Sequence, residues 1–413
     1  MELCKPIECT GCMACVNICP KGAITISQDQ EGFYIPLIQH DKCVKCGKCI
    51  KTCPMINAIE TPTMQKKVYG AWLKNRHLRK ESTSGGAFTA FAKAIFKDKG
   101  TVYGVGYDDK LKVIHKGVER ESNLSELRGS KYVQSYIGDI YKEVSSDLKD
   151  NRKVLFVGTA CQVAGLYAFL GKRFESQLFT IDLVCHGVPS PNVFKSYLSF
   201  MEKKYSSNVS NVYFRNKKPG WYVYGMKLLF SEQKCYEADT YSDPFIRGFL
   251  RNFFLRSCCY DCKYANINRV ADITLADFWG YQSTNYFNMD DDKGISMIMI
   301  NSANGMNIFN QARKYLKYWE KTVEEAVNGN PALSHPFSEP VEREAFWKDY
   351  NSLPFEEVIE KYMYAEKIPE WFTRRDTEIK KNKRYFFRHI PYVLLKNIIG
   401  DKCYESIKSV IKR

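Results

Sequence analysis

The sequence has 413 residues, which is enough for roughly two to four domains with sizeable cores. Its 45% hydrophobic and 26% charged residues are typical of a globular protein, and no apolar run approaches the length of a membrane span. The net charge of +15 leaves an acidic protein, an anionic lipid surface or a nucleic acid open as partners.

The chain has sixteen cysteines, a number that would suggest disulfides in a secreted protein. Its first residues, MELCKPIECTGC, lack the basic and then apolar layout of a signal peptide. We therefore expect a cytoplasmic protein with reduced thiols that bind metal.

One cysteine pattern occurs twice near the N-terminus, each time as C-x-x-C-x-x-C-x-x-x-C-P. Bacterial two-cluster ferredoxins hold a pair of 4Fe-4S clusters with this run, and the fourth cysteine of each run serves the other cluster. Disulfides or structural zinc fit two identical four-cysteine runs poorly. We therefore assign Cys9, Cys12, Cys15 and Cys53 to a first cluster, and Cys19, Cys43, Cys46 and Cys49 to a second. Cys4 lies outside the pattern.

Residues 1–60 are thus predicted to form a ferredoxin-like unit, with short strands at 23–27 and 33–38. A polar linker at 57–67 precedes a strand that begins at Val68. Two small-residue sites follow, each able to hold a phosphate or a flavin edge through backbone donors, although serine and glycine also cap ordinary helices. They are Ser84, Gly85 and Gly86, ahead of a helix, and Gly129, Ser130 and Lys131.

Two strand-loop-helix units come next, with buried strands at 154–157 and 179–184, and they predict a parallel sheet. Cys161 and Cys185 follow these strands and fall at the carboxyl edge of that sheet, where α/β folds place their sites. Cys258, Cys259 and Cys262 precede another predicted strand at 272–278. A third four-thiolate site and a set of buried, inert thiols are equally compatible with this arrangement.

The region 335–413 is predicted to be a basic helical tail. Twelve Lys or Arg and four Asp or Glu lie between Arg374 and Arg413, a net charge of +8. The apolar stretch 390–399 could touch an anionic membrane surface, or it could dock on the protein itself.

Seven motifs follow one another along the chain: 81–86 (ESTSGG), 128–134 (RGSKYVQ), 158–162 (GTACQ), 184–190 (VCHGVPS), 213–221 (YFRNKKPGW), 256–264 (RSCCYDCKY) and 272–280 (DITLADFWG). In this order they resemble the motifs of the family of coenzyme F-420 hydrogenase/dehydrogenase beta subunits. The resemblance implies a core of the beta-subunit type at 68–145 and 150–330, of α/β class with a mostly parallel sheet, fused behind the ferredoxin-like unit.

Members of this family are flavoproteins, so the resemblance implies FAD and a further 4Fe-4S cluster in the core. It favours Cys161, Cys185, Cys259 and Cys262 as the cluster ligands, because Cys258 aligns with a serine of the family. The candidates for FAD binding are Ser84, Gly85, Gly86, Gly129, Ser130, Lys131 and Thr159.

The candidates to orient or protonate a substrate are His186, Arg215, Lys217 and Asp277. Each has a plainer interpretation: His186 could hydrogen-bond a ligand sulfur, Arg215 and Lys217 could be a solvated pair, and Asp277 could cap a turn. Ala160, Asn216 and Ala276 replace the proline, aspartate and glycine usual in three of the motifs, which leaves the substrate open.

The hypothesis is an oxidoreductase that takes electrons from an acidic ferredoxin or flavodoxin and passes them, through clusters and FAD, to an organic substrate. Coenzyme F-420 and a surface-polysaccharide precursor are the substrates that the family suggests. The alternative is a non-catalytic electron-transfer subunit that connects a partner enzyme to ferredoxin. No nucleic-acid-binding fold is recognisable, so nucleic acid is not an expected partner.

Overall fold

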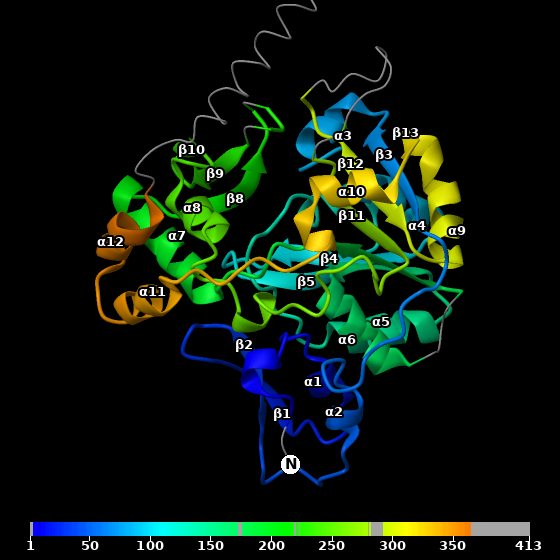
Figure 1. The fold of residues 1–413 in the computed structure, drawn as a ribbon, viewed down its shortest axis with the longest axis horizontal. Helices are drawn as coiled ribbons and strands as arrows, with labels where there is room; N and C mark the ends of the chain where they lie inside the picture. Colours follow the sequence, from blue (N-terminus) through cyan, green and yellow to red (C-terminus); the bar gives the residue numbers. More distant parts are fainter. Residues whose placement is uncertain are drawn as a thin grey trace, which may run out of the picture. The chain divides into compact units, whose positions relative to one another are not determined.

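A sheet of eight strands forms the centre of the computed structural model, which describes residues 3–171, 176–218, 220–222, 224–279, 281 and 292–364 (Figure 1). In spatial order the strands are β13 (Leu316–Lys321), β3 (Lys67–Leu73), β12 (Ser296–Ile300), β11 (Ile273–Asp277), β7 (Leu178–Leu183), β6 (Val154–Thr159), β4 (Thr101–Tyr107) and β5 (Val113–Val118). The four strands from β11 to β4 run parallel. The outer strands β5, β12, β3 and β13 pair antiparallel.

The predicted α/β class is confirmed, and the parallel centre contains both predicted strand-loop-helix units. Strand β6 leads into α6 (Ala160–Leu170), and β7 leads through a loop into α7 (Pro191–Tyr205). Nearly every residue of β6 and β7 is buried, as expected of strands covered on both faces. The expectation of a mostly parallel sheet holds for this centre, whereas the outer strands are antiparallel.

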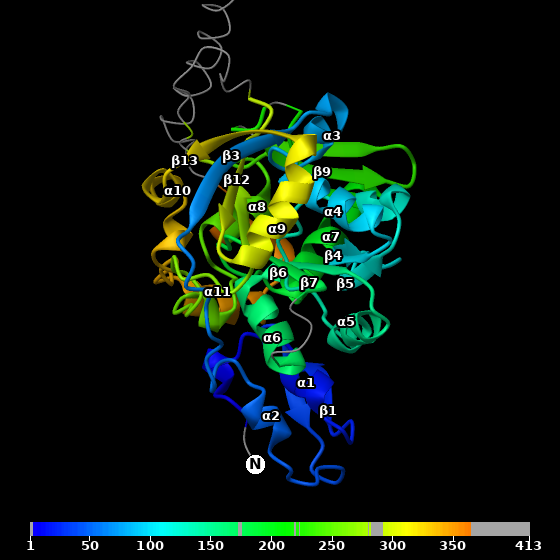
Figure 2. The same cartoon turned by 90° about the vertical axis from the view of Figure 1, so that its right-hand side faces the viewer.

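Helices cover both faces of the sheet (Figure 2). Leu155 and Val157 of β6 pack in one apolar core with α4 (Ala87–Lys97) and α9 (Ala303–Ala312). Their neighbours Val154 and Phe156 pack in another core, with α5 (Ile140–Lys149) and α6. Because successive residues of a strand point to opposite sides, these two helix pairs lie on opposite faces.

The N-terminal cysteine runs fold into a small unit built on a two-stranded antiparallel sheet. Its elements are η1 (Pro6–Glu8), α1 (Ala14–Ile18), β1 (Ile24–Gln28), β2 (Tyr34–Ile38) and α2 (Lys48–Lys51). The two predicted strands are therefore confirmed. Helix α1 packs against α6 and α5 of the core, and the Asn17 amide donates to the Gly138 carbonyl at 2.9 Å. The small unit is thus fixed to the helices that cover one face of the large sheet.

A third sheet lies beside α7 and shares an aromatic core with the C-terminal helices. Its strands are β8 (Val209–Asn216), β9 (Gly225–Phe230) and β10 (Cys235–Asp239), and its helices are α8 (Pro244–Leu250), α11 (Arg343–Tyr350) and α12 (Phe355–Val358). Other short helical segments are α3 (Arg76–Glu81), η2 (Glu121–Glu126), η3 (Ser257–Cys259), η5 (Arg313–Tyr315), α10 (Val323–Gly329), η6 (Pro331–Leu333) and η7 (Ile359–Met363).

Met1–Tyr364 form one compact unit, and α11 and α12, in the predicted tail region, belong to it. The predicted domain boundaries within this unit stay predictions. The stretch 390–399, predicted to touch a membrane or the protein, lies outside the described residues. Of the helices that the structure describes, none combines the length and the apolar character that a membrane span requires.

Candidate iron–sulfur and cofactor site

The thiols of the first predicted cluster lie together at the start of α1. Cys12 and Cys15 both interact electrostatically with Cys9 and Cys53. Burial, helped by these neighbouring thiolates, raises the pKa of the Cys12 thiol to about 12. Crowded buried thiolates are unfavourable unless a cation compensates them, and iron supplies that charge. The chemistry of these four thiols therefore suits a bound cluster, whereas no group of three ligands among the described residues lies close enough to hold a single metal ion.

The thiols of the second predicted cluster line a small apolar recess at the other end of the unit. All four, Cys19, Cys43, Cys46 and Cys49, contribute to its wall. Cys49 also interacts electrostatically with Cys19 and Cys43. In both sets the fourth cysteine of one run meets the first three of the other, as the predicted exchange requires.

Cys4, which lies outside the repeated pattern, joins the first set. Its thiol interacts with those of Cys53 and Cys9, and this interaction raises the pKa of Cys4. The cysteine spacing could not predict this contact. Cys4 precedes the repeated run, and only the folding of the chain brings it close to Cys53.

The core cysteines gather at the carboxyl edge of the large sheet. Cys161 lies in the first turn of α6, Cys185 follows β7, and Cys258 and Cys259 lie in η3. Cys161 interacts electrostatically with Cys262, Cys185 and Cys258. Cys259 interacts with Cys258, Cys185 and Cys262. Five thiols thus surround the predicted third site, and the choice between Cys258 and Cys259 stays a prediction.

Helix α6 connects the first thiol set to the core set. Cys161 is in the first turn of the helix, and one turn later Gly165 lies against Cys12. A Cβ at Gly165 would stand 3.0 Å from the Cys12 Sγ. Two tyrosines, the buried Tyr141 and the partly buried Tyr264, each interact electrostatically with Cys12 and with Cys161. The Tyr141 hydroxyl donates to the Gln162 carbonyl at 2.8 Å. The two sets are therefore separated only by packed side chains.

Substituting Gly165 with alanine should damage this contact. The added Cβ would meet the Cys12 Cβ and the Tyr141 hydroxyl, both at 2.9 Å. Overpacking of this kind costs about 1–3 kcal/mol, against about 1 kcal/mol gained from alanine's helix propensity. We expect a lower unfolding temperature and iron lost from the first cluster, measured by calorimetry and iron assay. Wild-type stability with full iron would contradict the close packing.

A cavity of about 300 Å³ lies next to the core thiols, within the size range of small-molecule sites. Cys185 forms part of its wall. Six of the seven predicted FAD-binding residues also line it: Ser84, Gly86, Gly129, Ser130, Lys131 and Thr159. Gly85 is next to the wall, where a Cβ would stand 2.3 Å from the Ala71 carbonyl oxygen.

Two helices begin at the cavity. Gly86, at φ 90°, caps the start of α4, and Thr159 starts α6 with a reciprocal capping box to Gln162. The Ser130 backbone N–H donates to the Thr83 hydroxyl at 3.0 Å, which joins the two small-residue loops. Helix N-termini favour anions, so this end of the cavity suits phosphate groups.

Lys131 has its ammonium turned toward the protein. It donates to the carbonyls of Val105 at 2.8 Å, Arg128 at 3.0 Å and Glu126 at 3.3 Å. Burial lowers its pKa to about 7. Lys131 therefore ties together the loops that carry Gly129 and Ser130, in addition to lining the cavity.

The four substrate candidates occupy different positions. His186 and Asp277 line the cavity, whereas Arg215 lies behind Asp277 and is paired with it. Asp277 also accepts from the Trp221 indole N–H at 2.6 Å. His186 bonds to the Asn252 side chain at 2.6 Å and stacks on Phe337 at 3.7 Å, and its burial lowers its pKa.

Lys217 contacts the loop that carries Ser84. Its ammonium donates to the carbonyls of Lys293 at 2.7 Å, Ser84 at 2.8 Å and Arg79 at 3.0 Å. Through these bonds Lys217 supports the cavity wall from outside. The sequence suggested that Lys217 would face the substrate instead.

One polar network at the cavity was missed by sequence reasoning. Ser135 and Gln162 line the cavity, and the Gln162 amide donates to the Ser135 hydroxyl at 2.9 Å. That hydroxyl is 2.9 Å from Nδ1 of His115, a buried residue whose burial lowers its pKa to about 4. The tautomer of the imidazole decides which of the two groups donates in this bond. Only alternation along β5 could have indicated that His115 faces inward.

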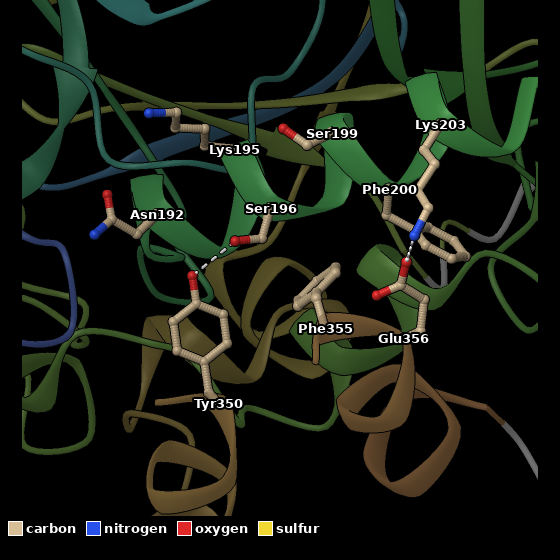
Figure 3. A pocket seen from close by; sticks show the side chains of 9 residues that line it. All are labelled: Asn192, Lys195, Ser196, Ser199, Phe200, Lys203, Tyr350, Phe355 and Glu356. Atoms are coloured by element: carbon tan, nitrogen blue, oxygen red, sulfur yellow. Dashed lines mark hydrogen bonds and ion pairs between the residues drawn. The ribbon is translucent and has the colours of Figure 1, made fainter. Parts of the chain in front are cut away.

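A second pocket lies between α7 and the helices α11 and α12 (Figure 3). The Ser196 and Tyr350 hydroxyls hydrogen-bond across it at 2.9 Å, and Lys203 pairs with Glu356 at 3.1 Å (Figure 3). Its lining includes none of the predicted site residues. We interpret this pocket as part of the packing interface between α7 and the C-terminal helices.

Two groups of thiols in a small hairpin unit define an iron–sulfur electron-transfer protein, and a third group of thiols lies beside a cavity at the edge of the α/β sheet. Residues 151–326 match the family model for the C terminus of the coenzyme F420 hydrogenase/dehydrogenase beta subunit, and residues 8–57 match the "4Fe-4S dicluster domain". Residues 151–326 therefore carry the C-terminal region of this family of beta subunits, and a dicluster domain lies ahead of it in the chain. The predicted family and dicluster domain are thus confirmed.

The relatives agree with this division. The chain is 23% identical to the F subunit of the F(420)H(2) dehydrogenase of Methanosarcina mazei over 294 residues, 66% of this chain and 77% of that one. It is 36% identical to the VorC subunit of the ketoisovalerate oxidoreductase of Methanothermobacter marburgensis over 56 residues, 13% of this chain and 71% of that one.

A solved structure, of the F420-reducing [NiFe] hydrogenase complex from Methanosarcina barkeri derivatised with xenon, is also similar. The match has 17% identity and a TM-score of 0.44, and it covers 67% of this chain and 89% of that chain. At this TM-score the likeness supports no further conclusion.

Proposed function

We propose that this chain is a ferredoxin-linked, FAD-dependent oxidoreductase that takes electrons from an acidic carrier and delivers them to an organic substrate. The observation that carries the proposal is the cavity wall, which combines a core thiol, Cys185, with two small-residue loops and two helix N-termini. Bound FAD would supply the exchange between single electrons and a hydride.

The positions of the thiol sets support a path for electrons, from the second set through the first set to the core set. Cys46 of the second set is exposed, and the recess around it carries Lys21, Lys45 and Lys48. Val44, beside them, is 58% exposed. A basic rim around an exposed apolar residue suits docking of an acidic ferredoxin or flavodoxin. The first set lies between this face and the core thiols, because Cys12 packs on α6 one turn from Cys161.

The residues that would hold FAD divide into two groups. The start of α4 at Gly86, the start of α6 at Thr159 and the loop at Gly129 offer backbone donors for the pyrophosphate. The apolar part of the wall, which includes Leu275 and Phe249, offers a surface for a flat ring. Lys131 and Lys217 hold the two loops in place through carbonyl groups.

The substrate would meet the cavity beside His186 and Asp277, which line it. A relative is named for its action on F(420)H(2), so a reduced or oxidised deazaflavin coenzyme is the substrate that we favour. A surface-polysaccharide precursor is the alternative substrate that we propose.

A role as a non-catalytic electron-transfer subunit is the second candidate function, because both of these relatives are named as subunits of an enzyme. Turnover of coenzyme F-420 by the purified chain with reduced ferredoxin would exclude it. Turnover only after a partner protein is added would support it.

A pair of glycine variants tests the FAD site. Gly129 and Gly171 both have positive φ, 85° and 68°, and nothing lies within 4 Å of a Cβ built on either. Aspartate brings backbone strain at both, but only Gly129 lines the cavity, where the new charge would face phosphate.

We expect Gly129→Asp to lose most of its flavin and keep its iron, whereas Gly171→Asp keeps both, as measured by heat release of flavin and by iron assay. A wild-type chain purified without oxygen that releases no flavin would remove the FAD proposal. Equal flavin content in the two variants would show that the flavin does not bind beside Gly129.

A further inference from the structure

Arg256 is a buried arginine at the junction of the small cysteine unit and the core. Its side chain is almost completely enclosed, with 3% of the residue exposed. The Nε donates to the Cys9 carbonyl at 2.7 Å, and Nη1 donates to the Tyr34 carbonyl at 3.0 Å. Its own backbone N–H is bonded to the Val188 carbonyl of the core at 3.0 Å. Arg256 thus spans from the core to the first thiol set.

The guanidinium also reaches two thiols. It interacts electrostatically with Cys9, a predicted ligand of the first cluster, and with Cys258 in the core set. The guanidinium therefore lies between the first thiol set and the core thiol set.

Arg256 differs from the other buried arginines near the thiols. Arg269 pairs with Asp182 at 3.0 Å, and Arg343 pairs with Glu31 at 2.5 Å. No ion pair among the described residues joins Arg256 to a carboxylate within 4.0 Å. Asp29 acts on Arg256 electrostatically without forming an ion pair, and a buried cation without a paired anion is strongly unfavourable, so a negative group is expected beside it. A cluster held by four thiolates is such a group.

We propose that Arg256 is the counter-ion of the cluster held by Cys9, Cys12, Cys15 and Cys53, and that its charge sets the reduction potential of that cluster. Reduction adds one electron, and hence one negative charge, while the guanidinium stays protonated and no bond changes. A fixed positive charge favours the more negative state, so Arg256 raises the potential. The inference rests on the proposed function only in requiring this cluster to be present.

The test uses three variants of the full chain. Arg256→Gln removes the charge and keeps a donor, Arg256→Lys keeps the charge, and Arg251→Gln removes an exposed arginine five positions earlier. Each is purified without oxygen, assayed for iron, and titrated with dithionite while the clusters are followed by electron paramagnetic resonance.

We expect one cluster signal to shift to lower potential in Arg256→Gln, with a smaller shift in Arg256→Lys and none in Arg251→Gln. Full iron and unchanged potentials in Arg256→Gln would overturn the inference. If Arg256→Gln loses iron, Arg256→Lys decides: restored iron supports the charge role, and iron loss in both variants overturns it in favour of packing. A wild-type chain without the cluster signals would instead overturn the proposed function.

Discussion

Replacing Cys161 with serine is expected to lower the iron content by about four atoms per chain, one cubane of the three expected. Cys161 is in the first turn of α6, its sulfur lies 3.1 Å from the Thr159 hydroxyl, and its thiol interacts with Cys185 and Cys262. No other described cysteine of α6 could replace it. The loss should also stop reduction of the flavin by reduced ferredoxin, because the core set lies between the first set and the cavity.

Cys235→Ser is the matched control, because Cys235 is an exposed cysteine on β10, outside all three thiol groups. Iron assay and anaerobic mixing with reduced ferredoxin measure both effects. Full iron in Cys161→Ser would show that the core thiols are inert, and rapid flavin reduction without the iron would show that electrons bypass them.

Asp277→Asn is expected to destabilise the fold by about 3–5 kcal/mol, the cost of leaving a buried charge without its partner. Asp277 accepts from the Arg215 guanidinium and from the Trp221 indole, and only 3% of the Arg215 side chain is exposed. The Arg215 Nε and Nη2 have no hydrogen-bond partner among the described residues, so the carboxylate is its main compensation. Denaturant unfolding of the variant and the wild type measures the difference.

Glu237→Gln is the control for this prediction. Glu237 pairs with Lys218 and Lys227 at the surface, both at 3.0 Å, and removal of a surface pair is expected to cost less than about 1 kcal/mol. If Asp277→Asn is as stable as Glu237→Gln and yet fails to turn over substrate, Asp277 acts on the substrate and the structural explanation is wrong.

The sequence predicts well the features that depend on local spacing. The two cysteine runs and the match of residues 8–57 to the dicluster domain agree, because ligand spacing is set by the cluster itself. The apolar runs that became β6 and β7 are buried on both faces, and the small residues Gly86 and Gly129 take left-handed backbone conformations at the cavity.

Features that depend on contacts between residues far apart in the chain could not be predicted from the sequence. Arg215 and Asp277 are 62 positions apart, and Lys217 meets loops more than 130 and 70 positions away, so neither partner could be assigned from a pattern. The antiparallel outer strands of the large sheet also escaped prediction, since alternation does not distinguish an added antiparallel strand from a parallel one. Cys4 and Arg256 belong to the same class of contact.

The most direct test of the proposed function is anaerobic rapid mixing of the wild-type chain with reduced ferredoxin while its visible absorption is followed. The proposed function predicts that the iron–sulfur absorption changes first and that flavin absorption then bleaches, without any other protein. Iron–sulfur reduction with no change in flavin, or no flavin absorption in a chain with full iron, would contradict it.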